Sequence, residues 1–85
     1  MGKEFPVRKE TTIGRQDADV TIQDEEVSRR HAIVRPVDGA LEIEDLGSLN
    51  GTHVNGTKVT SVARLAPGDV IQVGQCQLEV VQGAT

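Results

Sequence analysis

Turn-forming residues divide this sequence into short segments, and their spacing strongly restricts the folds that the chain can adopt. The pairs Asp38-Gly39 and Asn55-Gly56 are signals for two-residue hairpins, because both central positions of a type I′ turn need a positive φ. Pro67-Gly68-Asp69 marks a further turn. Between the turns, β-branched residues recur in alternating patterns, whereas helical spacing of apolar residues hardly occurs. The sequence therefore predicts an all-β fold.

The predicted strands are short and mostly antiparallel, which is typical of a β-sandwich with its loops gathered at the ends. We expect strands at residues 4–8, 11–14, 19–22, 30–36, 41–46, 52–54, 58–59, 70–73 and 75–81. Residues 82–85 are expected to form a tail.

The length and composition indicate one domain that does not bind nucleic acid. A second hydrophobic core would need roughly 50 residues of its own, which the 85 residues do not leave. Phe5 is the only aromatic residue, so the core must consist of Val, Ile, Leu and Ala, and stacking on bases is nearly excluded. The formal net charge of −4 argues against a protein that neutralises a DNA or RNA backbone.

The single cysteine, Cys76, can form neither an internal disulfide nor a cysteine cluster for a metal. We therefore expect no metal and no cofactor. Its alternation with Leu78 and Val80 predicts a small buried hydrophobe. No apolar stretch approaches the ~18 residues of a membrane span, and no signal peptide is recognisable. These features predict a cytoplasmic protein with no membrane insertion in this segment.

Glycine and polar residues are concentrated in three segments, residues 13–15, 27–31 and 47–56, each at the end of a predicted strand. Loops at one end of a sandwich converge, so residues far apart in sequence can surround one ligand. Together these segments would present guanidinium groups, a hydroxyl, carboxamides and backbone N–H groups. That set of groups suits an anion.

The same segments resemble the forkhead-associated (FHA) domain family. The matching residues, in order and at about the family's spacings, are Gly14-Arg15, Ser28 with His31, Asn50-Gly51 and Asn55-Gly56. The resemblance covers nearly the whole chain, and the stretches SRRH and GSLNGT are most similar to bacterial, especially actinobacterial, members. It implies a β-sandwich without enzymatic activity that binds a phosphothreonine-containing segment of a partner in Ser/Thr protein kinase signalling. The partner would be such a kinase or its substrates.

The resemblance also implies the residues that bind the phosphopeptide, namely Arg15, Ser28, Arg29, Leu49 and Asn50. Arg15 and the Ser28 hydroxyl would hold phosphate oxygens, while Arg29 adds its backbone N–H and positive charge. Leu49 stands where many members carry Thr or Arg, so it would contribute at most its backbone N–H. Asn50 would hydrogen-bond the partner's backbone. The residues alone leave simpler interpretations open: a surface Arg15, Ser28 as a turn residue, and Asn50 chosen for a positive φ.

A second group of residues is expected to support the site: Gly14, His31, Gly51, Asn55 and Gly56. The resemblance implies that His31 is a buried brace that hydrogen-bonds the loops. The competing enzyme hypothesis takes Ser28 as a nucleophile and His31 as its base, with Asp24 or Asp45 as the orienting group. It lacks a Gly-x-Ser-x-Gly elbow, and so small a sandwich offers little concavity.

Two further expectations concern partners. A phosphate-independent docking or self-association module on the same fold is the main alternative, because Leu49 weakens the phosphate site. FHA domains usually open with a strand ahead of the segment resembling residues 2–7, and we expect the chain to lack that strand. An unpaired sheet edge invites pairing with a second chain, so we expect either a homodimer, with the segment 75–81 as the more exposed edge, or an isolated domain of low stability.

Overall fold

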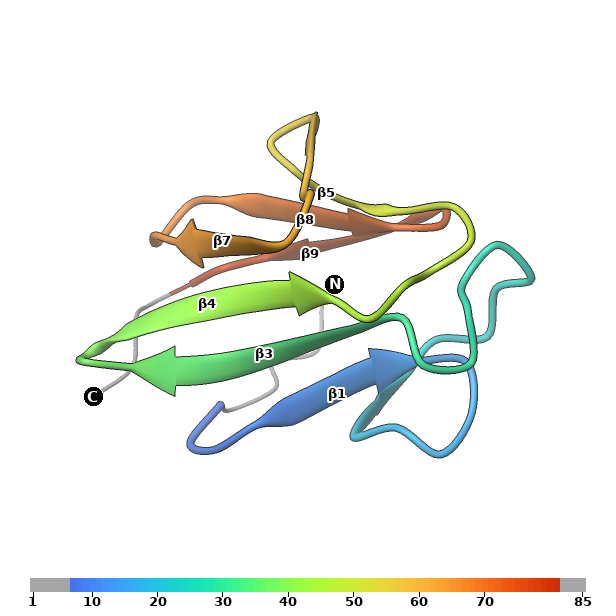
Figure 1. Cartoon of the computed structure of the whole chain (residues 1–85), viewed down its shortest axis with the longest axis horizontal. Coiled ribbons are helices and arrows are strands. Elements are labelled where there is room, and N and C mark those ends of the chain that lie inside the picture. Colours follow the sequence, from blue (N-terminus) through green and yellow to red (C-terminus); the bar gives the residue numbers. More distant parts are fainter. Residues whose placement is uncertain (1–6, 82–85) are drawn as a thin grey trace.

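The computed structural model describes residues 7–81, which form two packed sheets of short strands (Figure 1). The first sheet has the order β2-β1-β3-β4-β7. Its strands are β1 (Thr11–Gly14), β2 (Val20–Thr21), β3 (Ala32–Val37), β4 (Ala40–Asp45) and β7 (Val62–Leu65). Its pairings are antiparallel except for β1 with β2, which run parallel. The predicted all-β class is confirmed.

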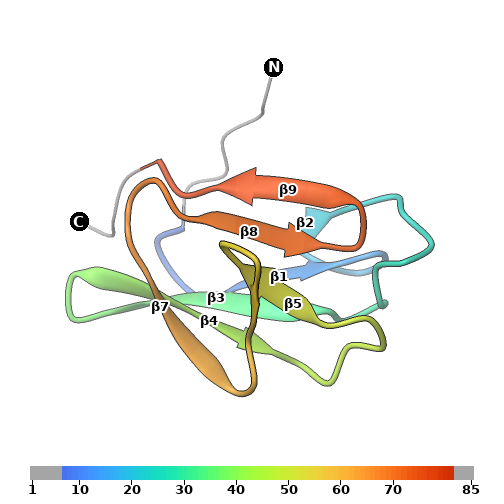
Figure 2. The same cartoon turned by 90° about the horizontal axis from the view of Figure 1, so that it is seen from above.

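The second sheet lies across from the first. It has the order β6-β5-β8-β9 and is antiparallel throughout. Its strands are β5 (Thr52–Val54), β6 (Thr57–Lys58), β8 (Val70–Val73) and β9 (Cys76–Glu79). Figure 2 shows β8 and β9 on one side of the molecule and β3 and β4 on the other, so the chain forms a sandwich.

The core between the sheets is aliphatic, as the shortage of aromatic residues requires. Strand alternation sends Leu41 and Ile43 of β4 inward, and Ile71 and Val73 of β8 face them from the other sheet. Cys76 is half-buried and packs against this core, so it is less enclosed than its alternation predicted.

The two predicted hairpin turns are confirmed by their backbone angles. Asp38 and Gly39 have φ values of 51° and 79°, and Asn55 and Gly56 have 51° and 84°. Asp38-Gly39 joins β3 to β4, and Asn55-Gly56 joins β5 to β6. The type I′ signal therefore identified both connections correctly.

Three predicted strands, at 11–14, 52–54 and 70–73, have the observed boundaries, and most others differ at their ends by one or two residues. Strand β7 was not predicted. Residues 4–6 of the first expected strand and the expected tail at 82–85 lie outside the described residues, and residues 7–8 belong to no strand. Within residues 7–81 no helix has the length and apolar character that crossing a membrane requires.

Candidate functional site

The three segments singled out in the sequence meet at one end of the sandwich, on the right of Figure 1. Strand β1 ends there, the loop between β2 and β3 follows, and the loop between β4 and β5 lies beside them. Arg15 donates its backbone N–H to the carbonyl of Ser28 at 3.0 Å, and Leu49 donates its N–H to the hydroxyl oxygen of Ser28 at 3.0 Å. The predicted convergence of these loops is confirmed.

Ser28 lies at the centre of this arrangement. Its half-buried hydroxyl oxygen accepts the Leu49 N–H, so its own proton remains available to a ligand. This contact fixes the oxygen against a neighbouring loop. It also occupies the Leu49 N–H, which the sequence had suggested for the ligand.

His31 is fully buried beneath the loops and joins two of them through its ring nitrogens. Its Nδ1 accepts the backbone N–H of Ser28 at 3.0 Å, and its Nε2 lies 2.8 Å from the carbonyl oxygen of Gly51. Because Nδ1 is an acceptor, the ring proton sits on Nε2 and is donated to Gly51. Both ring nitrogens thus contact backbone groups, and neither holds the Ser28 hydroxyl. The geometry is that of the expected brace and not that of a nucleophile with its base.

Asp45, at the end of β4, organises the loop that carries Leu49 and Asn50. Its carboxylate accepts hydrogen bonds from the N–H of Gly47 (2.9 Å), the N–H of Ser48 (3.0 Å), the hydroxyl of Ser48 (2.5 Å) and the hydroxyl of Thr52 (2.7 Å). Partial burial would raise the pKa of this carboxyl, but these hydrogen bonds outweigh burial and hold the pKa below its usual value. Sequence reasoning considered Asp45 only as a catalytic orienter and missed this role. The signal was an Asp with hydroxyl residues three and seven positions later.

Gly14 is required by a close approach of two backbones. A Cβ at this position would collide with the carbonyl oxygen of Arg29. Only glycine lets the end of β1 pass so close to the loop before β3. Gly14 therefore sets the distance between the loops of Arg15 and Ser28, in keeping with the expected supporting role.

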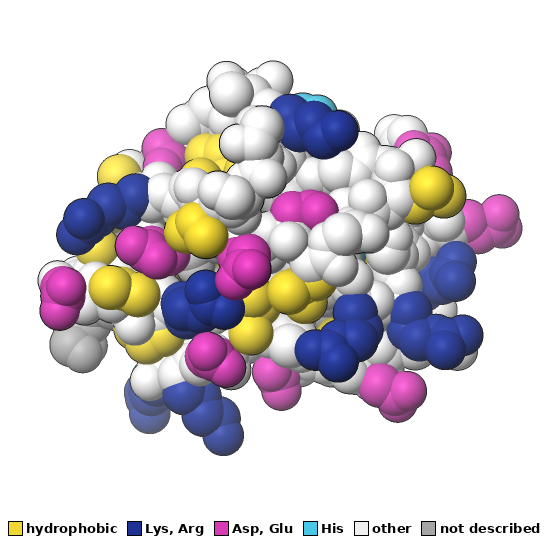
Figure 3. All heavy atoms as spheres, viewed as in Figure 1, with side chains coloured by type: hydrophobic (Ala, Val, Ile, Leu, Met, Phe, Trp, Pro, Cys, Tyr) yellow, Lys and Arg dark blue, Asp and Glu magenta, His cyan; other side chains and the backbone are white. Residues whose placement is uncertain are grey.

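The arginines at this end of the molecule form no ion pair with an acidic residue of the described part of the chain. Both ion pairs among residues 7–81 belong to Arg35, on the outer face of the first sheet. The Arg15 guanidinium reaches only the backbone carbonyl of Glu25, at 3.5 Å, while Arg29 and Arg30 are exposed. Figure 3 shows Lys and Arg side chains at the loop end and elsewhere on the same face, with acidic side chains among them. Arg15 and Arg29 can therefore turn to an anion at Ser28 without breaking an ion pair within residues 7–81.

Leu49 and Asn50 form the tip of the loop after β4. The Leu49 side chain is 88% exposed although its backbone is fixed by the bond to Ser28. Asn50 is not among the residues with positive φ, so backbone strain does not explain its identity. One of its amide protons goes to the carbonyl of Glu26 at 2.9 Å. The amide oxygen and a second proton remain for a ligand.

Asn55 supports a different part of the fold from the one expected. Its amide donates to Asp69 and accepts from the N–H of Val70, both at 2.9 Å. These bonds join the β5–β6 hairpin to the turn at residues 66–69, at the end of β5 remote from Ser28. Gly51 and Gly56 both have positive φ, of 88° and 84°, and Gly51 is the one whose carbonyl contacts His31.

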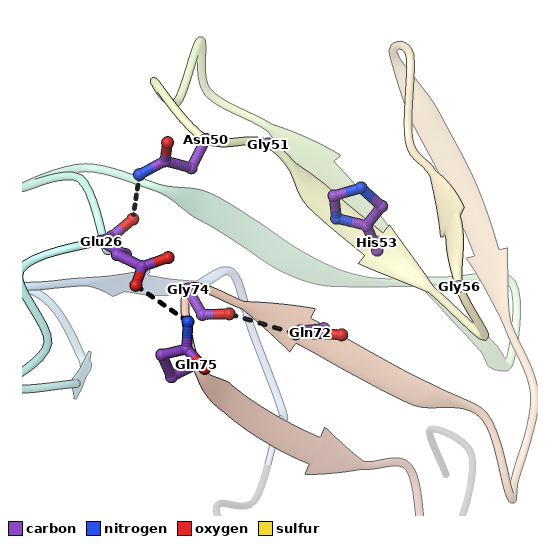
Figure 4. Close-up of a pocket in the computed structure, with 8 residues that line it drawn as sticks. All are labelled: Glu26, Asn50, Gly51, His53, Gly56, Gln72, Gly74 and Gln75. Atoms are coloured by element: carbon purple, nitrogen blue, oxygen red, sulfur yellow. Dashed lines mark hydrogen bonds between the residues drawn. The ribbon is translucent and has the colours of Figure 1, made fainter.

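A polar groove of about 400 Å³ begins at Asn50 and extends over the second sheet (Figure 4). Its lining residues are Glu26, Asn50, Gly51, His53, Gly56, Gln72, Gly74 and Gln75. Sequence reasoning did not find this groove, because Glu26 and Gln75 are brought together only by the fold. No group of three His, Cys, Asp or Glu side chains that could hold a metal ion occurs among the described residues.

Comparison with known proteins places these observations in one family. Residues 11–74, which are most of the chain, match the sequence model of the FHA domain. The chain is 44% identical over 77 residues to the oxoglutarate dehydrogenase inhibitor of Corynebacterium diphtheriae, covering 89% of this chain and 53% of that protein. It is 46% identical over 74 residues to the glycogen accumulation regulator GarA of Mycolicibacterium smegmatis. That match covers 86% of this chain and 46% of that protein. The chain thus spans about half the length of these relatives.

Solved structures show the same architecture. The FHA domain of the CT664 protein from Chlamydia trachomatis superposes with a TM-score of 0.85 at 31% identity, covering 94% of this chain and 82% of that one. A structure described as an analysis of phosphothreonine-dependent FHA domain interactions gives a TM-score of 0.84 at 37% identity. The match covers 92% of this chain and 81% of that one. EmbR of Mycobacterium tuberculosis, in complex with a low-affinity phosphopeptide, gives a TM-score of 0.82 at 31% identity. The match covers 89% of this chain and 20% of that one.

Proposed function

This chain belongs to the FHA domain family, and from that membership we propose that its loop end binds a phosphothreonine-containing segment of a partner protein. Two similar structures are described by phosphothreonine-dependent interactions and by a bound phosphopeptide. The observation in this chain that carries the proposal is the Ser28 hydroxyl, held by the Leu49 N–H and braced by His31, with its own proton free. That hydroxyl lies on the loop to which Arg15 is hydrogen-bonded.

Each binding residue then has a defined role. Arg15 supplies a guanidinium that can form two parallel charge-assisted bonds to phosphate, and Ser28 donates its hydroxyl proton to another phosphate oxygen. Arg29 adds positive charge and a backbone N–H, for which no acceptor is found within residues 7–81. Asn50 holds the partner's backbone with its remaining amide groups. Leu49 acts mainly through the N–H that fixes Ser28.

The domain is proposed to act as an adaptor and not as an enzyme. The ring nitrogens of His31 are both engaged with backbone groups, and the Asp45 carboxylate holds hydroxyls and N–H groups of its own loop. The Asp24 carboxylate accepts backbone N–H groups of Glu26 and Gln75. Neither acid orients His31, so the hydrogen bonds do not support the Ser–His–Asp interpretation.

We also propose that the domain works in the cytoplasm, downstream of Ser/Thr protein kinases, inside a longer regulatory protein. The curated relatives are named as an enzyme inhibitor and as a regulator, and both are about twice the length of this chain. A lone cysteine, Cys76, agrees with a reducing compartment. The partner is a kinase of this class or one of its substrates.

The proposal is tested by titrating the domain with a degenerate phosphothreonine peptide library and with its unphosphorylated counterpart. Binding that requires the phosphate is the expected result. Equal binding of both libraries would instead support phosphate-independent docking. The exposed Leu49 side chain at the tip of a fixed loop is the observation that favours that second function.

A further inference from the structure

We infer that Asp24 is a positioning residue for phosphopeptide binding, because its carboxylate fixes the turn that orients the Asn50 side chain. The inference rests on the proposed phosphopeptide binding and adds to it a residue that acts only through the fold. Both oxygens of the Asp24 carboxylate accept backbone N–H groups, one from Glu26 at 2.9 Å and the other from Gln75 at 2.8 Å.

The turn at residues 24–27 presents a main-chain acceptor to Asn50. The N–H of Val27 bonds back to the Asp24 carbonyl at 2.9 Å and closes the turn, while the Asp24 side chain holds the Glu26 N–H. The Glu26 carbonyl then accepts the Asn50 amide at 2.9 Å (Figure 4). The direction of the Asn50 side chain therefore depends on where this turn lies.

The bond to Gln75 anchors the same turn to the other sheet. Gln75 lies in the turn between β8 and β9, so the Asp24 carboxylate joins the loop before β3 to the second sheet. A Cβ on Gly74 would come within 2.8 Å of a Val27 methyl group and 3.0 Å of an Asp24 carboxylate oxygen, so the two turns are in direct contact. This joint sets the height of the Asn50 acceptor above the sandwich.

The joint needs a carboxylate, because both oxygens are used. Asparagine has one side-chain oxygen, so Asp24→Asn keeps one N–H group and turns an amide nitrogen toward the other. The bonds from Glu26 and Gln75 hold the pKa of Asp24 below its usual value, so this carboxyl is charged at neutral pH. A negative charge in the loop that carries Ser28 repels phosphate. Positioning and charge therefore predict opposite effects of Asp24→Asn on affinity.

The test is calorimetry with a phosphothreonine peptide. Asp24→Asn should weaken binding by about three- to tenfold, within the range for residues coupled through one hydrogen-bond network. Glu25→Gln is the matched control, because it removes one charge from an exposed side chain of the same turn, and its affinity should be equal to wild type or slightly higher. Gly74→Ala opens the joint from the other sheet without a change of charge and should weaken binding.

The Asn50 side-chain amide reports its position without any ligand. Its NMR signals, identified by their absence in Asn50→Ala, should move in Asp24→Asn and stay in place in Glu25→Gln, because only the first change loosens the Glu26 carbonyl. In the Asn50→Ala background, Asp24→Asn should no longer weaken binding, since the side chain that it positions is gone. A general loss of stability would not produce that dependence.

The outcomes separate this inference from the proposed function. An Asp24→Asn domain that binds as tightly as wild type, or an undiminished effect of this change in Asn50→Ala, would overturn the positioning role. Unmoved Asn50 signals would overturn it as well. If Asp24→Asn does not fold, the same comparisons made with Gly74→Ala decide the inference. Failure of the wild-type domain to bind any phosphothreonine peptide would overturn the proposed function, and the inference with it.

Discussion

Removing the Asp45 carboxylate should loosen the loop that carries Leu49 and Asn50. In Asp45→Ala, two backbone N–H groups and the hydroxyls of Ser48 and Thr52 lose their common acceptor. Thr52 is fully buried, so water cannot replace that partner without rearrangement. An unsatisfied buried group costs about 1–3 kcal/mol, and hydrogen bonds to one charged acceptor are not additive. We expect the free energy of unfolding to fall by about 2–4 kcal/mol, a large part of the stability of so small a core.

Asp45→Asn should have a much smaller effect at neutral pH. Its amide oxygen can accept the two N–H groups, and the hydroxyls can turn to accept its amide protons, so we expect a loss of about 1 kcal/mol. The sign of the pH dependence follows from the lowered pKa of Asp45 in the folded state. The carboxylate's contribution is fully present above the ordinary value of 3.8 and is lost as the pH falls through the lower folded pKa. The difference between wild type and Asp45→Asn should therefore shrink below about pH 3.8.

Urea denaturation over a series of pH values measures these differences, and calorimetry with a phosphopeptide measures the effect on binding. Asp19, Asp24 and Asp69 also have a lowered pKa, but they are present in every variant and cancel in the comparison. An Asp45→Ala domain as stable as wild type would show that the carboxylate does not hold the loop. A difference for Asp45→Asn that stays constant through the acid range would refute the reasoning about its charge.

Three other predictions concern the site and the sheet edge. Arg15→Ala should weaken phosphopeptide binding by about 2 kcal/mol, or about thirtyfold, with an unchanged thermal melt, since the lost bonds go to the phosphate; unchanged affinity in calorimetry would remove Arg15 from the site. His31→Ala should lower the free energy of unfolding by about 3 kcal/mol, because it empties a buried site and leaves the Ser28 N–H and the Gly51 carbonyl without partners; denaturation that matches wild type would contradict the brace. Among residues 7–81, strand β9 has a neighbouring strand on one side only. Sedimentation should therefore show a dimer as the protein concentration rises. A monomer at every concentration would exclude pairing through this edge.

The fold was predictable where the local chemistry of the chain decides the structure. The hairpins at Asp38-Gly39 and Asn55-Gly56 were found because a positive φ restricts the residue types that can form them. Strand β7 was missed because it is short and its alternation is obscured by Val62, an apolar residue on the exposed face. Its existence depends on pairing with β4, where Ala63 lies opposite Ile43 and Leu65 opposite Leu41. Such a strand is fixed by its partner and not by its own sequence.

The site was predictable to the extent that a family pattern names it. Arg15, Ser28 and His31 do meet, as the order of the motifs suggested. The contact of Glu26 with Gln75 could not be predicted in this way, because the two residues are 49 apart in sequence and meet only in the folded chain.

The hydrogen bonds that hold the loops of the site together end on main-chain atoms and not on the side chains of residues 25 and 26. Asn50 and Arg15 donate to the backbone carbonyls of Glu26 and Glu25, and His31 contacts the backbone of Ser28 and Gly51. Because these bonds end on main-chain atoms, they survive a change of side chain at residues 25 and 26. The side chains of this acidic loop are therefore free to vary with the partner while the phosphate-binding residues stay in place. Phosphate recognition and the side-chain contacts of this loop with a partner can then change independently, because the bonds between the loops do not use those side chains.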